Sequence, residues 1–337
     1  MIRRNPVPHA ALVYAASRLL LSIVILFCCF ARTSLVAAQT GQQTDDDEVL
    51  RVSTNLIVFP ARIRDKKGQR PNGLTNSDLR LKDPDHATNG LYLAAGVDRI
   101  AIIFALDESG SLREIINEQR EGAVRLYERF GSRSSIAVLH FAEMPQIASN
   151  FARDSTGARS AFEVSARSNQ HTAIFDAAAK AVEMFAALPR VRSERRIVIL
   201  ISDGLDNLSK TRPDTVIDAA RDKTVSFYVI HLPLFEPRDG RLVVRAPAEG
   251  FRALAEKTGG KYFLANDAPL ATRDKIDLAP IFGAIEDDLR SQYLIGFYVA
   301  DKAHDGKLHK VWLSLPAGLE YQIGGQGYEN AHKFTIH

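Results

Sequence analysis

The stretch RIAIIFALDESGS, residues 99–111, decides the fold. Its first eight residues, Arg99 to Leu106, form an almost continuous apolar run, which is typical of a strand buried on both faces of a parallel sheet. Asp107 to Ser111 then bring oxygen-bearing side chains and a glycine to the point where the strand runs into a predicted helix. In an open α/β sheet, ligands collect outside the carboxyl ends of the strands. The stretch therefore predicts a parallel sheet and a ligand-binding site at the carboxyl end of this strand.

Apolar strands and amphipathic helices alternate after this stretch. The pattern predicts strands over 135–141, 196–201, 225–232 and 261–264, and helices over 111–130, 172–188, 214–221, 251–258 and 278–290. This alternation indicates a doubly wound α/β fold with a mainly parallel sheet. Strand patterns also lie outside it, over 49–63 and 78–81 on one side and over 292–299, 309–315 and 321–328 on the other. We expect these terminal segments to meet in one small β module.

The first 38 residues have the features of a secretory signal peptide. Arg3 and Arg4 precede an apolar run from Leu19 to Phe30, and small residues lead up to Ala38, after which we expect cleavage. The run is short for a membrane span, which needs about 20 residues. The alternative is an uncleaved anchor, although Arg18 interrupts a longer apolar span. We expect an exported protein, periplasmic or extracellular, with membrane contact only if the segment stays uncleaved.

The cysteine content and the net charge limit the classes of function that the mature chain could have. Cys28 and Cys29 are the only cysteines and both lie in the predicted signal segment, so the mature chain would have no disulfide and no thiol site. Removing that segment changes the formal net charge from +3 to about −1, so charge gives no argument for nucleic acid as a partner. The predicted organisation is a signal peptide 1–38, a linker 39–48, a β segment 49–97, an α/β domain 98–290 and a second β segment 291–337.

Three separate segments carry candidate metal ligands. Asp107, Ser109 and Ser111 form an Asp-x-Ser-x-Ser pattern, Asp203 follows the strand at 196–201, and Thr172 opens a helix. Carboxylates and hydroxyls at the strand ends suit a hard cation such as Mg²⁺. Each element also has a structural alternative, because Ser and Thr commonly cap helices and Asp-Gly commonly forms turns.

Together, in this order, these elements resemble the metal-ion-dependent adhesion site of von Willebrand factor A domains, over about residues 98–290. The resemblance implies that Ser109, Ser111 and Thr172 offer hydroxyl oxygens, while Asp107 and Asp203 hold Mg²⁺ directly or through water, with Mn²⁺ or Ca²⁺ as alternatives. Two carboxylates just neutralise a divalent ion, which leaves it able to accept an acidic side chain from a protein partner. The flanking β segments are similar to those of exported A-domain-related proteins of Acidobacteria.

Three further residues are candidates for contact with the partner. Glu108 occupies a free position in the motif and is expected to face solvent or the partner. His171 adjoins Thr172, and Asp206 follows Asp203. Apart from contact with the partner, Asp206 and its neighbour Asn207 either shape the loop or merely solvate it. The longer loop at 233–247 either contributes to partner specificity or is a surface loop without a role in binding.

A binding module fits the sequence better than an enzyme. The chain has no Gly-x-Ser-x-Gly elbow, no His-Glu-x-x-His helix and no Gly-Lys-Ser/Thr phosphate loop, and we assign no catalytic residue. Two alternatives stay open. One is metal-assisted hydrolysis, which needs a general base that the five ligand positions do not supply. The other is a metal-free scaffold in the cell envelope, in which the hydroxyls serve only as helix caps.

Overall fold

The computed structural model describes residues 55–82, 88–97, 99–108, 112–165, 171–189, 194–265, 276–299, 308–323 and 332–335. The predicted signal peptide and linker lie outside these ranges, as do Ser109 and Ser111. Within the described ranges, no helix combines the length and the hydropathy needed to cross a membrane.

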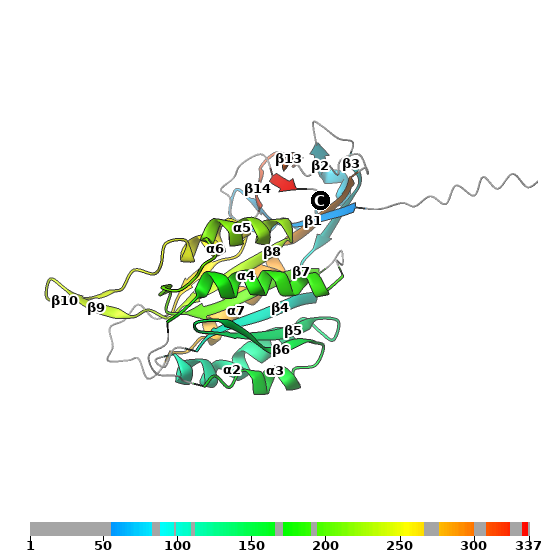
Figure 1. The fold of residues 1–337 in the computed structure, drawn as a ribbon. Helices are drawn as coiled ribbons and strands as arrows, with labels where there is room; N and C mark the ends of the chain where they lie inside the picture. Colours follow the sequence, from blue (N-terminus) through cyan, green and yellow to red (C-terminus); the bar gives the residue numbers. More distant parts are fainter. Residues whose placement is uncertain are drawn as a thin grey trace, which may run out of the picture. The chain divides into compact units, whose positions relative to one another are not determined.

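A six-stranded sheet forms the centre of the molecule (Figure 1). Its strand order is β11-β8-β7-β4-β5-β6, and every neighbouring pair is parallel except β5 with β6. The strands are β4 (Arg99–Asp107), β5 (Ser135–Phe141), β6 (Pro145–Ala152), β7 (Glu194–Ser202), β8 (Val225–His231) and β11 (Tyr262–Leu264). The prediction of a mainly parallel sheet is confirmed.

Helices cover both faces of this sheet because its strands are apolar on both faces. Along β4, Ile102 and Phe104 belong to one hydrophobic core, whereas Ala101 and Ile103 belong to the other. The first core packs under α2 (Arg113–Glu128), α3 (Thr156–Ala161) and α7 (Ala279–Ser291). The second packs under α4 (Ile174–Met184) with η2 (Phe185–Ala187), α5 (Pro213–Asp222) and α6 (Phe251–Thr258). Successive residues of a strand point to opposite faces, which fills both layers from one apolar run.

The N-terminal and C-terminal β segments meet, as predicted, but they form two sheets rather than one. The first has the order β14-β1-β12-β3, and the second has the order β15-β13-β2. Their bounds are β1 (Asn55–Asp65), η1 (Asn76–Asp78), β2 (Arg80–Lys82), β3 (Thr88–Ala95), β12 (Tyr293–Val299), β13 (Leu308–Ser314), β14 (Leu319–Ile323) and β15 (His332–Thr335). A shared core that includes Phe59, Ile295 and Leu313 lies across both sheets. We call these strands the terminal β module.

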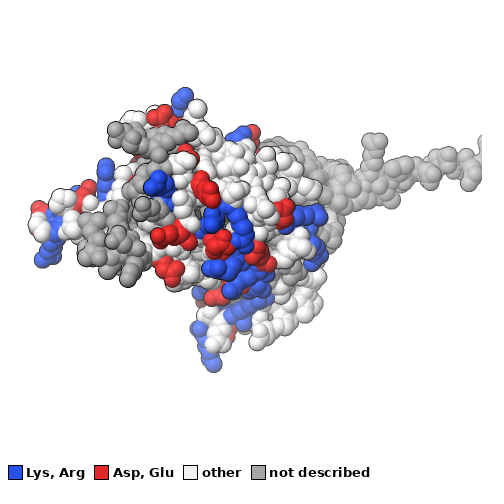
Figure 2. Space-filling model, turned by 90° about the horizontal axis from the view of Figure 1, so that it is seen from below, with Lys and Arg blue, Asp and Glu red and all other residues white. Residues whose placement is uncertain are grey.

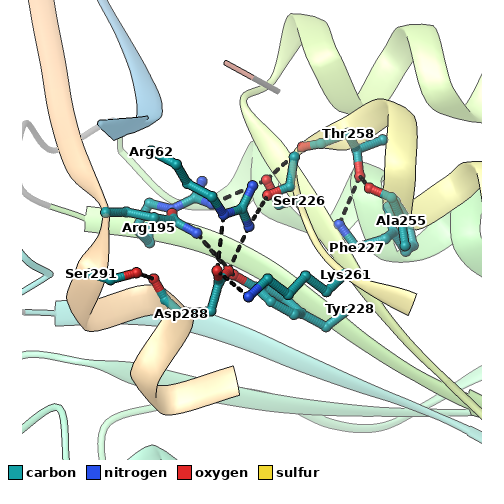
Figure 3. A network of polar contacts seen from close by, with 12 residues as sticks. Arg62, Arg195, Ser226, Phe227, Tyr228, Ala255, Thr258, Lys261, Asp288 and Ser291 are labelled. Carbon is teal, nitrogen blue, oxygen red and sulfur yellow. Dashed lines mark hydrogen bonds and ion pairs between the residues drawn. The ribbon is translucent and has the colours of Figure 1, made fainter. Parts of the chain in front are cut away.

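A buried polar network joins the terminal β module to the α/β domain (Figure 3). At its centre is Asp288 of α7, which is 3% exposed. Its carboxylate accepts hydrogen bonds from Arg62 Nε at 2.9 Å, the Tyr228 hydroxyl at 2.7 Å and Gln292 Nε2 at 2.8 Å, and lies 2.7 Å from Lys261 Nζ. Because Arg62 belongs to β1, the network connects a terminal strand with α7 and β8.

Arg195 of β7 extends the same network and is itself buried. Its Nε donates to Gln292 Oε1 at 3.1 Å, and its Nη2 donates to Ser226 Oγ at 3.1 Å. Ser226 in turn donates to the Thr258 carbonyl at 2.6 Å, at the end of α6. Arg62 also reaches this end, since its Nη2 donates to the Gly259 carbonyl at 3.1 Å. The network therefore links four elements of the α/β domain with β1.

Helices α2 and α3 present a surface of mixed charge. Figure 2 views this side and shows Lys and Arg interspersed with Asp and Glu. Several of these side chains form ion pairs, among them Arg120 with Glu163, Arg129 with Glu286 and Arg159 with Glu128. Alternating charges of this kind are typical of a solvated helix face.

Candidate metal centre

Two carboxylates lie at the carboxyl ends of neighbouring parallel strands. Strands β4 and β7 pair with Leu106 opposite Ile201, so Asp107 stands beside Ser202, and Asp203 follows immediately. Ser202 Oγ donates a hydrogen bond of 2.6 Å to Asp107 Oδ2. Asp107 is fully buried, and Asp203 is 7% exposed. Two carboxylates so far out of water need compensating partners, because a buried charge is costly unless it is paired or binds a metal.

A tight turn holds Asp203. The backbone N–H of Leu205 donates to Asp203 Oδ1 at 2.9 Å, and His231 Nε2 donates to the Asp203 carbonyl at 2.9 Å. Gly204 has a φ of +80°, and a Cβ there would come within 2.6 Å of the Pro247 Cβ. The turn therefore requires glycine. Burial lowers the pKa of His231, despite its hydrogen bond to the carbonyl, which acts in the opposite direction.

Thr172 lies beside this turn and is 6% exposed. Its backbone N–H donates to Asn207 Oδ1 at 2.9 Å, and its carbonyl accepts from the Asn207 N–H at 3.1 Å. The next N–H, of Ala173, donates to the Ala142 carbonyl after β5 at 2.8 Å. The loops after β5 and β7 thus fix Thr172 from two sides. The three described candidate ligands, Asp107, Thr172 and Asp203, belong to loops at the same edge of the sheet.

The structural alternative that treats Thr172 as the helix cap is wrong. The N-cap of α4 is Ala173, and the helix is capped from outside by the loop that follows Asp203. The Ile174 N–H donates to Asp206 Oδ1 at 2.7 Å, and the Phe175 N–H donates to Ser209 Oγ at 2.9 Å. The N-cap of α2 is likewise Leu112, with no side-chain cap hydrogen bond.

The partner-contact candidates have different environments. Asp206 is half-buried and caps α4, which supports its predicted role in shaping the loop. Glu108 does not face solvent, so that part of the expectation is wrong: it is 7% exposed, and its carboxylate lies 3.2 Å from His140 Nδ1. Glu108 directly follows β4, and its N–H donates to the Phe141 carbonyl at the end of β5 at 2.9 Å, so it continues the alternation of the strand and points away from the Asp107 side chain, toward His140. His171 is exposed beside Thr172.

The donor set fits a hard divalent cation. Among the described residues, no group of three or more His, Cys, Asp and Glu side chains could hold a metal. The predicted site needs no such group, because it combines two carboxylates with hydroxyl oxygens, and Ser109 and Ser111 fall outside the described ranges. Carboxylate and hydroxyl oxygens with some retained water are the usual surroundings of Mg²⁺. Asn207 shapes the loop through its contacts with Thr172, whereas sequence reasoning gave no supporting role to Ser202 and Ser209, whose hydrogen bonds to Asp107 and to the start of α4 no spacing rule predicts.

The fold is that of an α/β domain with a mainly parallel sheet and polar loops at the carboxyl ends of its strands. The model for the von Willebrand factor type A domain matches residues 101–272. The chain therefore belongs to the von Willebrand factor type A domain family, whose members commonly have protein-interaction and adhesion-like roles and are generally non-enzymatic. No curated protein matches the chain by sequence.

Solved structures of low sequence identity resemble the chain. A conserved hypothetical protein, BatB from Bacteroides thetaiotaomicron, is 20% identical with a TM-score of 0.43, and the match covers 56% of this chain and 96% of that one. Proximal thread matrix protein 1 from the mussel byssus, in a structure described as having a zinc-occupied MIDAS motif, is 19% identical with a TM-score of 0.43. That match covers 60% of this chain and 49% of the mussel chain.

Proposed function

We propose that this protein binds a divalent cation through Asp107, Ser109, Ser111, Thr172 and Asp203 and uses it to capture a protein ligand. One observation carries the proposal: the buried carboxylates of Asp107 and Asp203 follow adjacent parallel strands, and the loops on either side fix Thr172 at the same edge. Membership of the A-domain family supports the assignment. Mg²⁺ is the proposed ion, with Mn²⁺ or Ca²⁺ as alternatives.

The charge of the donor set supports capture of an acidic side chain. Asp107 and Asp203 would just neutralise a divalent ion, and the hydroxyls would add contacts without adding charge. The bound ion supplies a Lewis-acidic position for a carboxylate. A more acidic pocket would repel that carboxylate, since like charges within a few ångströms cost free energy. Glu108, the acidic residue next to Asp107, does not add to the charge of the donor set, because its carboxylate lies beside His140 of β5.

We also propose that the protein acts outside the cytoplasm, in the periplasm or beyond the cell. The support is the basic and apolar N-terminal segment that ends near Ala38. On this proposal the mature chain starts with a polar linker to residue 48, and the A domain, about residues 98–290, lies between the two segments that build the terminal β module.

Mn²⁺ binding followed by electron paramagnetic resonance tests the metal proposal. We expect one site per chain in the parent and a large loss of affinity in Asp107→Ala and Asp203→Ala. Glu108→Gln is the matched control, because it alters the neighbouring carboxylate that faces His140 and should keep the site. Equal Mn²⁺ binding by parent and both aspartate variants would contradict the proposal.

The same protein samples separate the two alternatives. A metal-assisted hydrolase would turn over phosphate and carboxylate ester substrates and lose that turnover in chelator. A metal-free scaffold would bind no Mn²⁺ and would keep its stability in chelator. The capture proposal predicts Mn²⁺ binding without turnover.

A further inference from the structure

The exposed large hydrophobic side chains of the described residues share one edge of the molecule. They are Met144, Ile147, Leu208, Leu242 and Leu264, with exposed fractions of 69%, 42%, 41%, 43% and 39%. We call this set the apolar rim. Single exposed hydrophobic residues scattered over a surface are ordinary, so the members that matter are those that lie next to the candidate metal site.

The sheet topology places every member at the carboxyl edge of the parallel strands. Met144 lies in the turn after β5, and Ile147 pairs with Leu139 near the end of that strand. Leu264 ends β11 and pairs with His231, the last residue of β8. Leu242 belongs to the hairpin of β9 (Phe235–Arg238) and β10 (Arg241–Val244), which leaves the end of β8 and projects at the left of Figure 1. This edge is the one that carries Asp107 and Asp203.

Met144 and Leu208 lie in the two loops that are hydrogen-bonded to the backbone at Thr172 and Ala173. The N–H of Leu208 donates to the Thr172 carbonyl at 3.2 Å. Met144 comes two residues after Ala142, whose carbonyl accepts from the residue that follows Thr172. Both side chains are therefore carried by backbone that is hydrogen-bonded to the candidate ligand segment.

Exposed cationic side chains lie in the same loop as Leu208. Lys210 and Arg212 follow Leu208 within four residues, and both are exposed. Their backbone is held because Asp176 accepts from the Lys210 N–H at 3.1 Å and from the Thr211 N–H at 2.8 Å. A partner that approaches over this loop meets apolar and positive groups together, which complements an acidic side chain with apolar neighbours.

We propose that the apolar rim receives a protein partner whose acidic residue is flanked by bulky apolar side chains. The proposal rests on the metal-dependent capture proposed above and specifies the chemistry of the partner. The carboxylate would occupy the metal site, and its apolar neighbours would cover Met144 and Leu208. Interfaces commonly combine one desolvated polar anchor with surrounding apolar contacts that exclude water.

Two five-residue peptides in millimolar Mg²⁺ test this proposal. One has the sequence Gly-Phe-Glu-Phe-Gly and the other Gly-Ser-Glu-Ser-Gly, both with blocked ends, and binding is measured by calorimetry. We expect the apolar-flanked peptide to bind about tenfold more tightly, as partial burial of two aromatic side chains implies. In the double variant Met144→Ser/Leu208→Ser the preference should fall below about threefold. Gln146→Ser, an exposed polar residue of the neighbouring strand, is the matched control and should keep it.

Each other outcome overturns a different statement. Equal Mg²⁺-dependent binding of both peptides contradicts the apolar rim but leaves metal-dependent capture intact. The apolar rim is also contradicted if neither peptide binds while Mg²⁺ still raises the unfolding temperature of the protein. It is contradicted as well if the double variant keeps the preference for the apolar-flanked peptide. A preference that is independent of Mg²⁺ and unaffected by Asp203→Ala contradicts the metal-dependent capture instead. Dimerisation of the parent that the double variant abolishes would replace the partner with a second copy of this chain.

Discussion

Four acidic side chains follow β4 and β7, and the backbone gives them different surroundings. Asp107 accepts a hydrogen bond from Ser202, whereas its neighbour Glu108 lies beside His140. Asp203 is held in a turn, whereas Asp206 caps α4. Alternation along an extended strand separates the first two, and the Gly204 turn separates the last two.

The capping role of Asp206 leads to a prediction about stability. Asp206→Ala removes the acceptor for the Ile174 N–H at the start of α4. Loss of an N-cap typically costs about 1 kcal/mol. For a domain of this size we expect the unfolding temperature to fall by roughly 2–4 °C. Thermal unfolding followed by circular dichroism measures this. Asp218→Ala, an exposed residue of α5, is the control with little effect, and a stable Asp206→Ala would contradict the capping role.

The candidate ligands could be chosen from sequence because each lies at or just after the end of a recognisable apolar strand or opens a predicted helix. Their supports could not be chosen in this way. Ser202 contacts Asp107 across two strands that are 95 residues apart in the chain. Ser209 reaches the start of α4 through a folded loop, and polar residues in such loops have no periodic pattern. The burial of Glu108 depended on His140, a contact that the sequence does not specify.

At the scale of elements, Asp288 connects α7 with β1 and β8. Asp288→Asn leaves Arg62 and Lys261 buried or half-buried without their counter-charge, and removing one member of a buried pair costs about 3–5 kcal/mol. We expect a loss of that size in urea unfolding. The double variant Arg62→Met/Asp288→Asn should cost less than the sum of the two single variants, because the groups interact directly. Additive losses would show that they do not.

Asp288 also predicts a dependence of stability on pH. Burial alone would raise the pKa of Asp288, but the hydrogen bonds and charges of Arg62 and Lys261 outweigh it and lower the pKa well below its usual range. The stabilisation is therefore complete above the pKa of an unfolded Asp, about 3.9, and is lost as pH falls below it. Between about pH 4 and pH 2, Asp288→Asn should show a slope of unfolding free energy against pH that is shallower by up to about 1.4 kcal/mol per unit. Identical slopes would contradict the assignment.

Most elements of the α/β domain were predictable because β-branched and apolar runs mark its parallel strands. Helix α6 has the predicted bounds, 251–258, and ends at Gly259, whose φ is +86°. The edge strand β6 and the short helix α3 were missed. Residues 145–152 contain few large apolar side chains, since an edge strand has only one neighbouring strand. The hairpin β9-β10 contains Pro237, which masks a strand in a sequence pattern.

At the scale of the whole molecule, the terminal β module and the α/β domain should unfold together. Strand β12 starts two residues after α7 ends, and the buried network of Asp288, Arg62 and Arg195 spans both parts. Differential scanning calorimetry should therefore show one transition with equal calorimetric and van't Hoff enthalpies. Two resolved transitions would indicate that the module is an independent unit.

Thermal unfolding in chelator and in millimolar Mg²⁺ shows whether Asp107 and Asp203 belong to one metal site. At about a hundredfold excess over the dissociation constant, a ligand of the folded state stabilises by about 2.7 kcal/mol, a shift of roughly 5–10 °C. We expect this shift in the parent and in Glu108→Gln, and its absence in Asp107→Ala and Asp203→Ala. A parent whose unfolding temperature is the same in chelator, Mg²⁺ and Mn²⁺ would contradict the metal site and favour the scaffold.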